Sequence, residues 1–402
     1  MIQIQKDVSL AMYSSFHIGG KASHFVEIKT TEDALEAWQF GQAQKMPIFF
    51  LGGGSNVLFP DQGLEALIIK NSINFIEKLP NDQVHVGAGT YTTALAQFCA
   101  DNELSGIEKL FALPGTFGGA IVGNAGTLGT EIKDVLLSAT LINPQGKITT
   151  VPASALDFQY RESNLKRNHQ LVLSGIIQLK PGQKDTIKQV MTDTKNWRRD
   201  HQPGGFSGGS FFKNPEGYSA GQLIEQAGLK GYTIGGAQVS PKHANFLTNT
   251  GKATSKDVML LAAHIKEVVK SQFGIELVEE IRPIQVWVPI ALLLTSTLMA
   301  TNFHSKIQLS NDTKEYIEKK LHSLSKYYVG ADADGVHTVV DVDHNHEKNN
   351  TGISMEARIT VGKKVFIATE RSTTVEEGID LIHDKLKTQL QRHKEKQQEN
   401  HE

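Results

Sequence analysis

The sequence predicts an α+β protein with more than one domain. Through the first part of the chain, short strand-like runs alternate with amphipathic helical patterns. From Met299 onward a second, complete pattern of strands and helices begins. At 402 residues with 39% hydrophobic content, the chain is long enough to form several cores.

Residues 1–189 are predicted to form the main α+β region. A helix is expected at Thr31–Gln44, where Thr31 precedes apolar residues at helical spacing, and a second helix at Thr92–Asn102. The expected strands are Phe25–Ile28, Pro47–Leu51, Ala66–Ile69, Val135–Ile142 and Leu171–Leu179.

The rest of the chain divides into three further segments. Residues 190–284 are predicted to form a smaller lobe, with helices at Ser219–Ala227 and Ser255–Phe273 and a turn at Gly235-Gly236. Residues 285–298 are an apolar linker, and residues 299–402 are a separate domain. Its expected order is strand, helix, three strands and a long helix, with a charged, frayed tail from about Lys394.

Composition excludes several classes of protein. The formal net charge of −2 gives no global field that would attract nucleic acid or an anionic membrane. A single cysteine, Cys99, rules out disulfides within the chain, and no signal segment opens it, so we expect a cytoplasmic protein. The uncharged run Val286–Ala300 contains Pro289 and is shorter than the about 20 residues that a membrane span needs, so no membrane contact is expected.

Two glycine-rich segments predict a large cofactor that carries phosphate groups. The first, Leu51–Leu58, reads Leu-Gly-Gly-Gly-Ser-Asn-Val-Leu, and the second runs from Leu113 to Gly129. Glycines allow backbone amides to approach an anionic or flat group closely, although each segment alone is also typical of a tight turn. Neither is a P-loop, and Gly87-Ala88-Gly89 lacks the third glycine of a dinucleotide fingerprint.

Three polar motifs next to apolar segments contain candidate catalytic residues. They are Tyr160–Ser163, Gly208–Pro215 and Glu279–Arg282. Ser210 follows two glycines but lacks the Gly-x-Ser-x-Gly pattern of hydrolases, so a proton donor is favoured over a nucleophile. The planar guanidinium of Arg161 suits a carboxylate or an enolate oxygen, although such a residue alone is most often part of a surface ion pair.

Together these motifs resemble the UDP-N-acetylenolpyruvoylglucosamine reductase family over about residues 13–284. The glycine segments, Tyr160-Arg161-x-Ser163, Gly209–Pro215 and Glu280–Arg282 occur in the order found in that family. The resemblance implies a two-lobed FAD-binding fold of the vanillyl-alcohol-oxidase type, in residues 1–189, with a smaller substrate-binding lobe in 190–284. It also implies a flavoenzyme of peptidoglycan synthesis, in which NADPH reduces noncovalent FAD and the flavin reduces the enolpyruvyl group of a UDP-sugar.

The family's catalytic roles carry over to three positions. Arg161 would hold the enolpyruvyl carboxylate and stabilise the enolic intermediate, Ser210 would protonate it, and Glu280 would assist. The residues that would bind FAD are Gly52, Gly53, Gly54, Ser55, Asn56, Pro114, Gly115, Thr116, Gly118, Gly119, Asn124, Ala125 and Gly126. The residues that would contact the UDP-sugar are Tyr160, Asn214, Lys230 and His243. The family's tyrosine in a Gly-Ala-Tyr-Gly segment is absent here, where the chain reads Gly126-Thr127-Leu128-Gly129.

Residues 299–394 resemble a different family, the ribosome hibernation promoting factors. The charged helical patterns at Asp312–Leu321 and Asp384–Lys396 carry this resemblance. It implies binding to the small ribosomal subunit and silencing of translation, with phosphate contacts from cations near the carboxyl end; the solvated face of a helix is the alternative. The candidate cations are Lys363, Lys364, Arg371, Lys385, Lys387, Arg392 and Lys394. The alternating residues of Asp341–Glu347 also suggest metal ligands, but a polar strand end with a hairpin turn is favoured and no metal is expected.

The junction between the two parts matches neither family. We hypothesise that two neighbouring reading frames have been joined, which the intact mass of the product from its native source would test. Two alternatives to the reductase remain open at this point. One is an oxidase of the same flavin fold that uses oxygen, and the other is a ribosome-binding protein with an inactive flavin region.

Overall fold

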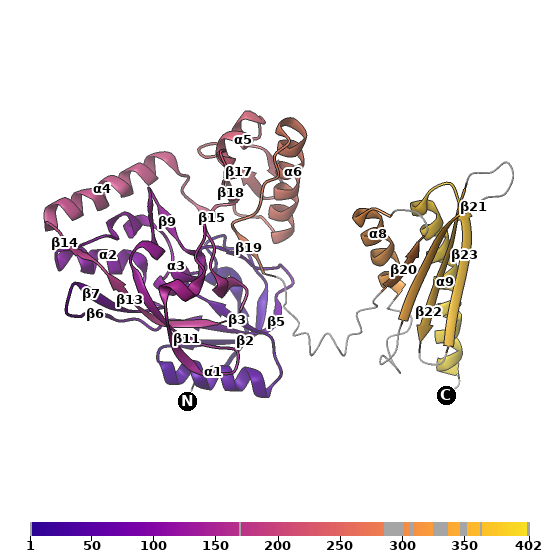
Figure 1. The fold of residues 1–402 in the computed structure, drawn as a ribbon, viewed down its shortest axis with the longest axis horizontal. Coiled ribbons are helices and arrows are strands. Elements are labelled where there is room, and N and C mark those ends of the chain that lie inside the picture. Colours follow the sequence, from indigo (N-terminus) through magenta and orange to yellow (C-terminus); the bar gives the residue numbers. More distant parts are fainter. Residues whose placement is uncertain are drawn as a thin grey trace. The chain divides into compact units, whose positions relative to one another are not determined.

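The computed structural model describes residues 2–168, 170–284, 301–305, 309–324, 337–345, 352–361 and 364–399. The chain separates into two compact units, residues 1–287 and residues 288–402 (Figure 1). The predicted apolar run at 286–300 lies outside the described residues. Among the residues that are described, no helix combines the length and apolar character needed to cross a membrane.

The first sheet of unit 1 places the first glycine segment at a strand end. Its strands are β1 (Gln5–Ser9), β2 (Lys21–Ile28), β5 (Leu64–Asn71) and β3 (Ile48–Leu51), in that order, and β2, β5 and β3 run parallel. Helix α1 (Thr31–Ala43) connects β2 to β3 and begins with a capping box between Thr30 and Asp33. The segment Gly52–Asn56 follows the carboxyl end of β3, where ligands of parallel sheets usually bind.

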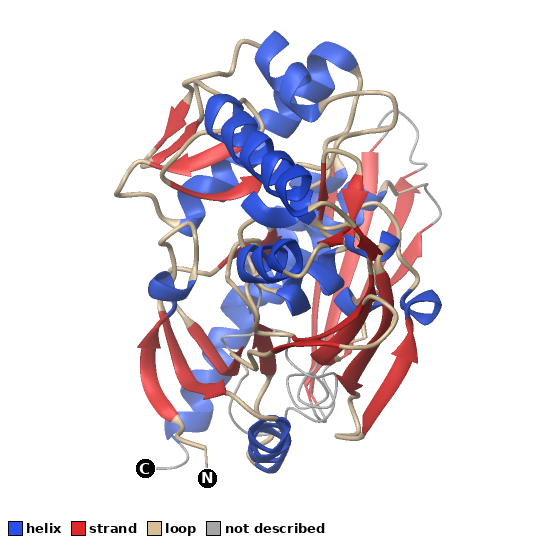
Figure 2. Ribbon diagram, turned by 90° about the vertical axis from the view of Figure 1, so that its left-hand side faces the viewer, coloured by secondary structure: helices blue, strands red, loops and turns tan. Residues whose placement is uncertain are grey.

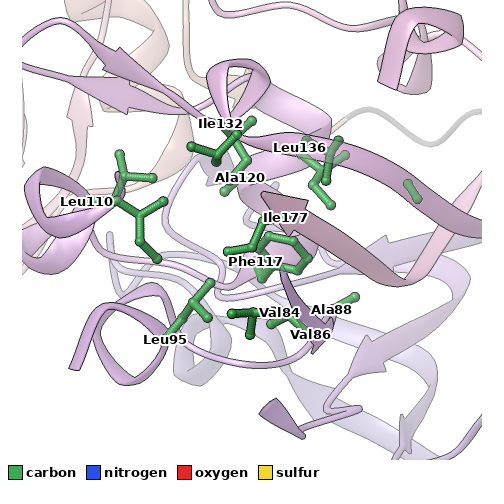
Figure 3. Close-up of a cluster of buried hydrophobic side chains, with 14 of the residues drawn as sticks. Val84, Val86, Ala88, Leu95, Leu110, Phe117, Ala120, Ile132, Leu136 and Ile177 are labelled. Carbon is green, nitrogen blue, oxygen red and sulfur yellow. The ribbon is translucent and has the colours of Figure 1, made fainter. Parts of the chain in front are cut away.

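The second sheet of unit 1 supports the second glycine segment. Its strand order is β12 (Ile148–Pro152), β11 (Leu136–Ile142), β13 (Leu171–Gln178), β7 (Gln83–Gly87) and β6 (Ile76–Lys78), all antiparallel. Helices α2 (Thr92–Asp101) and α3 (Phe117–Gly123) share its hydrophobic core. In Figure 3, Phe117 of α3 lies against Ile177 and near Val84 and Val86, so the core fixes the helix that follows the glycines.

The smaller lobe of unit 1 follows helix α4 (Lys184–His201). Its sheet has the order β15 (Phe206–Ser210), β18 (Phe246–Asn249), β17 (Ala237–Val239) and β16 (Thr233–Ile234), packed with α5 (Ala220–Gln226) and α6 (Ser255–Phe273). The boundary predicted after residue 189 falls inside α4, so the end of this helix is a better place to divide the two lobes.

The end of the lobe returns to the first glycine segment. Strand β19 (Arg282–Pro283) pairs in parallel with β4 (Val57–Leu58), directly after Gly52–Asn56. The short strands that complete unit 1 are β8 (Leu104–Ser105), β9 (Gly126–Thr127), β10 (Thr130–Glu131) and β14 (Lys180–Pro181). Its 3-10 turns are Leu10–Tyr13, Glu108–Ala112, Ile132–Asp134, Ala153–Leu156 and Asn164–Lys166.

Unit 2 has the predicted order of elements. Its sheet runs β20 (Thr301–Ser305), β21 (His337–Asn345), β22 (Gly352–Val361) and β23 (Lys364–Ser372). Helix α8 (Asn311–His322) connects the parallel strands β20 and β21, and α9 (Val375–Glu399) shares a core with the sheet. Figure 1 shows α9 lying along this sheet, and Figure 2 colours the helices and strands of the chain by type. The charged tail predicted from Lys394 is helical as far as Glu399, because α9 continues through it.

Candidate active site

One cavity of about 460 Å³ in unit 1 brings most of the predicted site residues together. Both glycine segments line it, and so do β15 and the segment that carries Glu280. The predicted catalytic and substrate-contacting residues among its lining are Tyr160, Arg161, Ser210, Asn214, His243 and Glu280. Of the predicted cofactor-binding residues, all except Asn124 line it. Residues from distant parts of the sequence therefore face a single space.

The two glycine segments approach each other too closely for side chains. A Cβ atom on Gly53 would lie 2.8 Å from the Cα atom of Gly115, and a Cβ on Gly52 would lie 2.7 Å from Oγ1 of Thr116. Ser55 Oγ donates a hydrogen bond of 3.1 Å to the carbonyl of Pro114. This arrangement exposes backbone amides to a ligand, which is what a phosphate-bearing group requires.

Thr116 adds an unsatisfied polar group to this cradle. Its Oγ1 is buried and has no hydrogen-bond partner among the described residues, and the residue lines the cavity. A buried hydroxyl without a partner costs free energy, about 1–3 kcal/mol. A ligand with acceptor oxygens between the glycine segments would satisfy it.

A side chain added between the glycine segments is expected to weaken the binding of the cofactor. In Gly53→Ala the added methyl group meets backbone of Gly115, so the loops must separate. Overpacking of this kind costs about 1–3 kcal/mol, or roughly a 10- to 100-fold loss of affinity. The ratio of flavin to protein absorbance after gel filtration would measure it. Gly204→Ala is the matched control, because a Cβ atom there meets nothing within 4 Å. Equal flavin content in both variants would contradict the cradle.

Arg161 is held by three acceptors around its guanidinium. Its Nη2 donates to the carbonyl of Gly126 at 2.7 Å, Nη1 lies 3.3 Å from Glu131 Oε1, and Nε lies 3.3 Å from Glu280 Oε1. The Tyr160 ring lies beneath it, 5.0 Å from the guanidinium carbon. A guanidinium has five N–H groups, so two of them remain for a ligand.

The loop that carries Arg161 has an unusual backbone conformation. Arg161 has a φ of +55°, in the left-handed region that non-glycine residues rarely adopt. Gln159 and Glu162 exchange backbone hydrogen bonds across it, and Lys166 Nζ donates to the carbonyl of Arg161. Strain of this kind persists only where surrounding contacts fix it, and such residues cluster at functional sites.

The backbone of Glu280 connects candidate motifs from distant segments of the chain. Its backbone N–H donates to the Phe211 carbonyl at 2.7 Å, and its own carbonyl accepts from Asn56 Nδ2 at 3.1 Å. Burial raises the pKa of the Glu280 carboxyl group, and the nearby positive charge of Arg161 opposes that shift. Burial therefore favours the protonated acid beyond the pH range usual for glutamate.

This raised pKa predicts how stability depends on pH. Because folded Glu280 binds its proton more tightly than the unfolded chain does, its contribution to stability is present below the ordinary glutamate pKa and is lost as pH rises through the folded pKa. We subtract the free energy of unfolding of Glu280→Gln from that of the wild type. This difference should decrease as pH rises from about 4 to about 8. Urea unfolding at both pH values measures it, and a difference that rises with pH would refute the assignment.

Ser210 ends strand β15 at the cavity wall. It pairs with Phe246 of β18, and the φ of +87° at Gly209 turns the chain just before it. The next two residues, Phe211 and Phe212, are fully buried and fix its position. Within the described residues, the Ser210 hydroxyl makes no hydrogen bond, so it is available to a ligand.

Three of the four residues predicted to bind the substrate line the cavity, and Lys230 does not. Asn214 lines the cavity while its Oδ1 accepts from the backbone of Ala220, and His243 lines it with a pKa lowered by burial. Lys230 is not part of the lining and pairs with Glu225 at 2.6 Å. The structure therefore does not bring Lys230 to the cavity.

Asn124 supports the site rather than lining it. It is fully buried, and its φ of +43° ends helix α3. Its amide donates to Glu131 at 3.1 Å and to the carbonyl of Gln159 at 2.8 Å, while its oxygen accepts from the backbone of Lys133. Asn124 thus fixes Gln159, which begins the turn that carries Arg161, and Glu131, whose carboxylate contacts Arg161.

Sequence reasoning left out three further cations of the cavity wall, Lys166, Arg198 and Arg282. Lys166 follows the Arg161 motif by one helical turn and pairs with Glu162, and burial lowers its pKa. Arg282 belongs to the Glu279–Arg282 motif, so that motif already contained the signal. Arg198 lies on α4, a helix that the sequence analysis did not predict.

Two family models match unit 1. One, described as an FAD binding domain, matches residues 22–152, and the other, described as the C-terminal domain of UDP-N-acetylenolpyruvoylglucosamine reductase, matches residues 202–284. A third, described as sigma 54 modulation protein / S30EA ribosomal protein, matches residues 301–398. Unit 1 is thus a flavoprotein with the predicted FAD-binding fold and a smaller lobe, joined to a second domain.

Several relatives agree over nearly their whole length. The reductase named UDP-N-acetylenolpyruvoylglucosamine reductase of Chlamydia pneumoniae is 40% identical over 281 residues, which are 69% of this chain and 91% of that protein. The one of Protochlamydia amoebophila is 41% identical over 281 residues, 70% and 93% of the two chains. The crystal structure of the Thermus caldophilus enzyme superposes with a TM-score of 0.62 at 32% identity, covering 71% of this chain and all (100%) of that one. The chain belongs to the UDP-N-acetylenolpyruvoylglucosamine reductase family.

The residues present fit FAD. The close approach of the glycine segments and the unpartnered Thr116 hydroxyl suit the diphosphate of this cofactor, and both observations come from the cavity itself. No histidine lies in either glycine segment.

Proposed function

We propose that this chain reduces UDP-N-acetylenolpyruvoylglucosamine to UDP-N-acetylmuramate for peptidoglycan synthesis, with noncovalent FAD and with NADPH as the reductant. Family membership supports the reaction and the flavin. The observation that carries the assignment of residues is the grouping of Arg161, Ser210 and Glu280 around the cavity that the glycine segments also line. FAD, when bound, passes electrons from the nicotinamide to the enolpyruvyl double bond.

The residues proposed to hold FAD come from both glycine segments. Backbone N–H groups of Gly52–Asn56, Gly115 and Thr116 would bind the diphosphate, with the Thr116 hydroxyl as an additional donor, while Pro114, which has no N–H group, lines the same space. Gly118, Gly119, Ala125 and Gly126 line the same space without bulky side chains. Leu128 lines it where the family has tyrosine, so an apolar contact replaces an aromatic one.

Arg161 is proposed to bind the enolpyruvyl carboxylate. Its two remaining N–H groups suit two carboxylate oxygens, and the three existing contacts fix the plane of the fork. When negative charge develops on the substrate as the double bond is reduced, the same guanidinium stabilises it. Glu131, which the sequence analysis did not include, is a positioning residue for this fork.

Ser210 and Glu280 are proposed to handle the proton. The Ser210 hydroxyl has no other hydrogen-bond partner in the described part of the chain, so it can donate its proton to the carbon that becomes electron-rich. Glu280, with its raised pKa, assists by hydrogen bonding to the enolic oxygen while it stays close to the guanidinium of Arg161. Tyr160, Asn214 and His243 are proposed to bind the UDP-sugar, and Lys230 is omitted because it does not line the cavity.

NADPH oxidation by the flavin-loaded chain tests this function. The absorbance of NADPH should fall only when the enolpyruvyl sugar nucleotide is present, and the product should be saturated at the former double bond. An oxidase of the same fold would instead consume oxygen without this substrate. Oxidation that ignores the sugar nucleotide would therefore reject the reductase.

We further propose that unit 2 binds the small ribosomal subunit. The match of residues 301–398 to the S30EA family supports this. Lys364 and Arg392 are exposed and Lys387 is half-buried, so they can reach rRNA phosphates, whereas Lys385 already pairs with Glu370 at 2.5 Å. The side chain of Lys394 and the residue Lys363 lie outside the described set.

Cosedimentation of the full chain with small ribosomal subunits should show binding that weakens as salt rises. The double variant Lys387→Ala with Arg392→Ala should reduce the bound fraction and the salt dependence, because each phosphate contact adds to the slope by about one. Lys252→Ala, an exposed change in unit 1, is the control. Binding that is absent, or unaffected by the double variant, would count against these contacts.

A further inference from the structure

Arg198 lines the cavity with no counter-ion among the described residues; Arg282 likewise makes no ion pair there, although the charge of Glu162 opposes the effect of burial on the Arg282 pKa. Arg161 contacts Glu131 and Glu280, and Lys166 pairs with Glu162. Arg198 makes no side-chain hydrogen bond or ion pair with any described residue, and it lines the same cavity. The cavity therefore contains at Arg198 a positive charge that no carboxylate of the described residues neutralises.

The surroundings of Arg198 make this charge costly without a ligand. The side chain is partly buried, and burial lowers the pKa of its guanidinium with no opposing carboxylate. A buried charge is stable only when it is paired, and an arginine remains charged in proteins. The last turn of α4 favours a cation, as it does for Arg199 and His201, but the helix end gives Arg198 no carboxylate partner.

The last turn of α4 faces the smaller lobe. Lys242 Nζ donates to the carbonyl of Arg199 at 2.5 Å, and the next residue, His243, lines the cavity. Trp197 and Gln202 line it on either side of Arg198. Arg198 therefore faces the end of the cavity that the smaller lobe shapes.

We propose that Arg198 binds the diphosphate of the sugar nucleotide. The planar guanidinium matches phosphate oxygens through paired hydrogen bonds, and the glycine segments already supply amides for the diphosphate of FAD. This inference rests on the proposed function and adds one substrate-binding residue to it. The same chemistry would suit a phosphate of NADPH or FAD, so the experiment separates the three sources.

Arg199 provides a matched control one residue away. It is exposed, it does not line the cavity, and it pairs with Asp200 at 2.9 Å. Substitutions of Arg198 and Arg199 remove the same charge from the same turn of helix. A difference in UDP affinity between the two variants therefore reflects the position of Arg198 at the cavity, and not the loss of a charge from the helix.

Calorimetric titration of the flavin-loaded full chain with UDP tests the proposal. Arg198→Ala should raise the Kd for UDP by about 10- to 100-fold, as expected for the loss of a charge-assisted hydrogen bond. Arg198→Lys should restore part of the affinity because it keeps the charge, which also covers the case in which the alanine variant folds poorly. Arg199→Ala should bind UDP as the wild type does, and the flavin content should remain unchanged in all three variants.

Three outcomes would overturn the assignment. If Arg198→Ala binds UDP as tightly as the wild type does, Arg198 does not bind the diphosphate. A loss of flavin at unchanged UDP affinity would assign the phosphate to FAD, and a raised KM for NADPH alone would assign it to the reductant. If the wild type itself neither binds UDP nor oxidises NADPH with the sugar nucleotide, the proposed function fails; if it does both, only the role of Arg198 is in question.

Discussion

Replacing Ser210 by alanine is expected to lower the turnover number with the enolpyruvyl sugar nucleotide by about 100- to 10,000-fold, the range that a general acid contributes. The Ser210 hydroxyl lines the cavity, and the buried Phe211 and Phe212 hold it in place. Because the change removes one oxygen atom from the end of β15, the fold and the glycine segments should remain intact. Stopped-flow absorbance of the flavin, with NADPH alone and then with the sugar nucleotide, measures the two half-reactions separately.

Only the second half-reaction should be slow in this variant. Reduction of the flavin by NADPH does not need the proton of Ser210 and should keep its rate. Ser207→Ala is the control, because Ser207 lies on the same strand, pairs with Thr248 and does not line the cavity. Equal turnover of the Ser210 variant and the wild type would remove Ser210 as the proton donor.

Exchange of Arg161 for lysine should lower kcat by about 100- to 1,000-fold although the positive charge is kept. Lysine cannot contact Gly126, Glu131 and Glu280 while still presenting two parallel donors to a carboxylate. Steady-state kinetics with the sugar nucleotide should show a lowered kcat, because the enolic charge develops after binding, and a raised KM, because the paired contact to the substrate carboxylate is lost. The control is Arg167→Lys, a nearby arginine whose side chain is 61% exposed.

Glu131→Gln extends this test to the residue that positions the guanidinium. The amide keeps one oxygen for Arg161, but its NH2 group would face Lys133 Nζ and the Asn124 amide, which now donate to the carboxylate. A misplacement of about 1 Å can cost about 100-fold in rate, so kcat should fall. Lys133→Ala, which removes only the outer partner of Glu131, should leave kcat nearly unchanged. A similar loss in both variants would indicate a general effect on the β9–β10 hairpin.

The elements that the sequence predicted well have strong local signals. The helix expected at Ser255–Phe273 has those bounds in the structure, because a capping box between Thr254 and Asp257 starts it and Gly274 ends it. Helix α4 was not predicted, because it is strongly polar and buries only Ile187, Met191 and Thr194 along its length. These three residues lie at helical spacing, but only two of them are apolar, so the local signal is weak.

The sequence also predicted part of the candidate site. Motif order predicted Arg161, Ser210 and Glu280 as catalytic residues; the structure places all three at one cavity, and their roles stay a prediction. The supporting contacts were not predictable, because Glu131 and Asn124 act through a hairpin and a left-handed residue whose geometry arises only in the folded chain. Lys230, which follows a helix, was expected to contact the UDP-sugar. In the structure it pairs with Glu225 instead.

The parallel pairing of β19 with β4 places the completion of the proposed catalytic centre near the end of unit 1. Glu280 and Arg282 are the last site residues to be synthesised, and they are anchored to Asn56 and Val57, which are among the first. On the ribosome, domains generally fold as units as they emerge. The growing chain thus carries its glycine segments and the Glu131 partner of Arg161 well before the second carboxylate partner, Glu280, is synthesised. A protein truncated before residue 279 should lack a formed centre, whereas one that ends after Ile284 should have it complete.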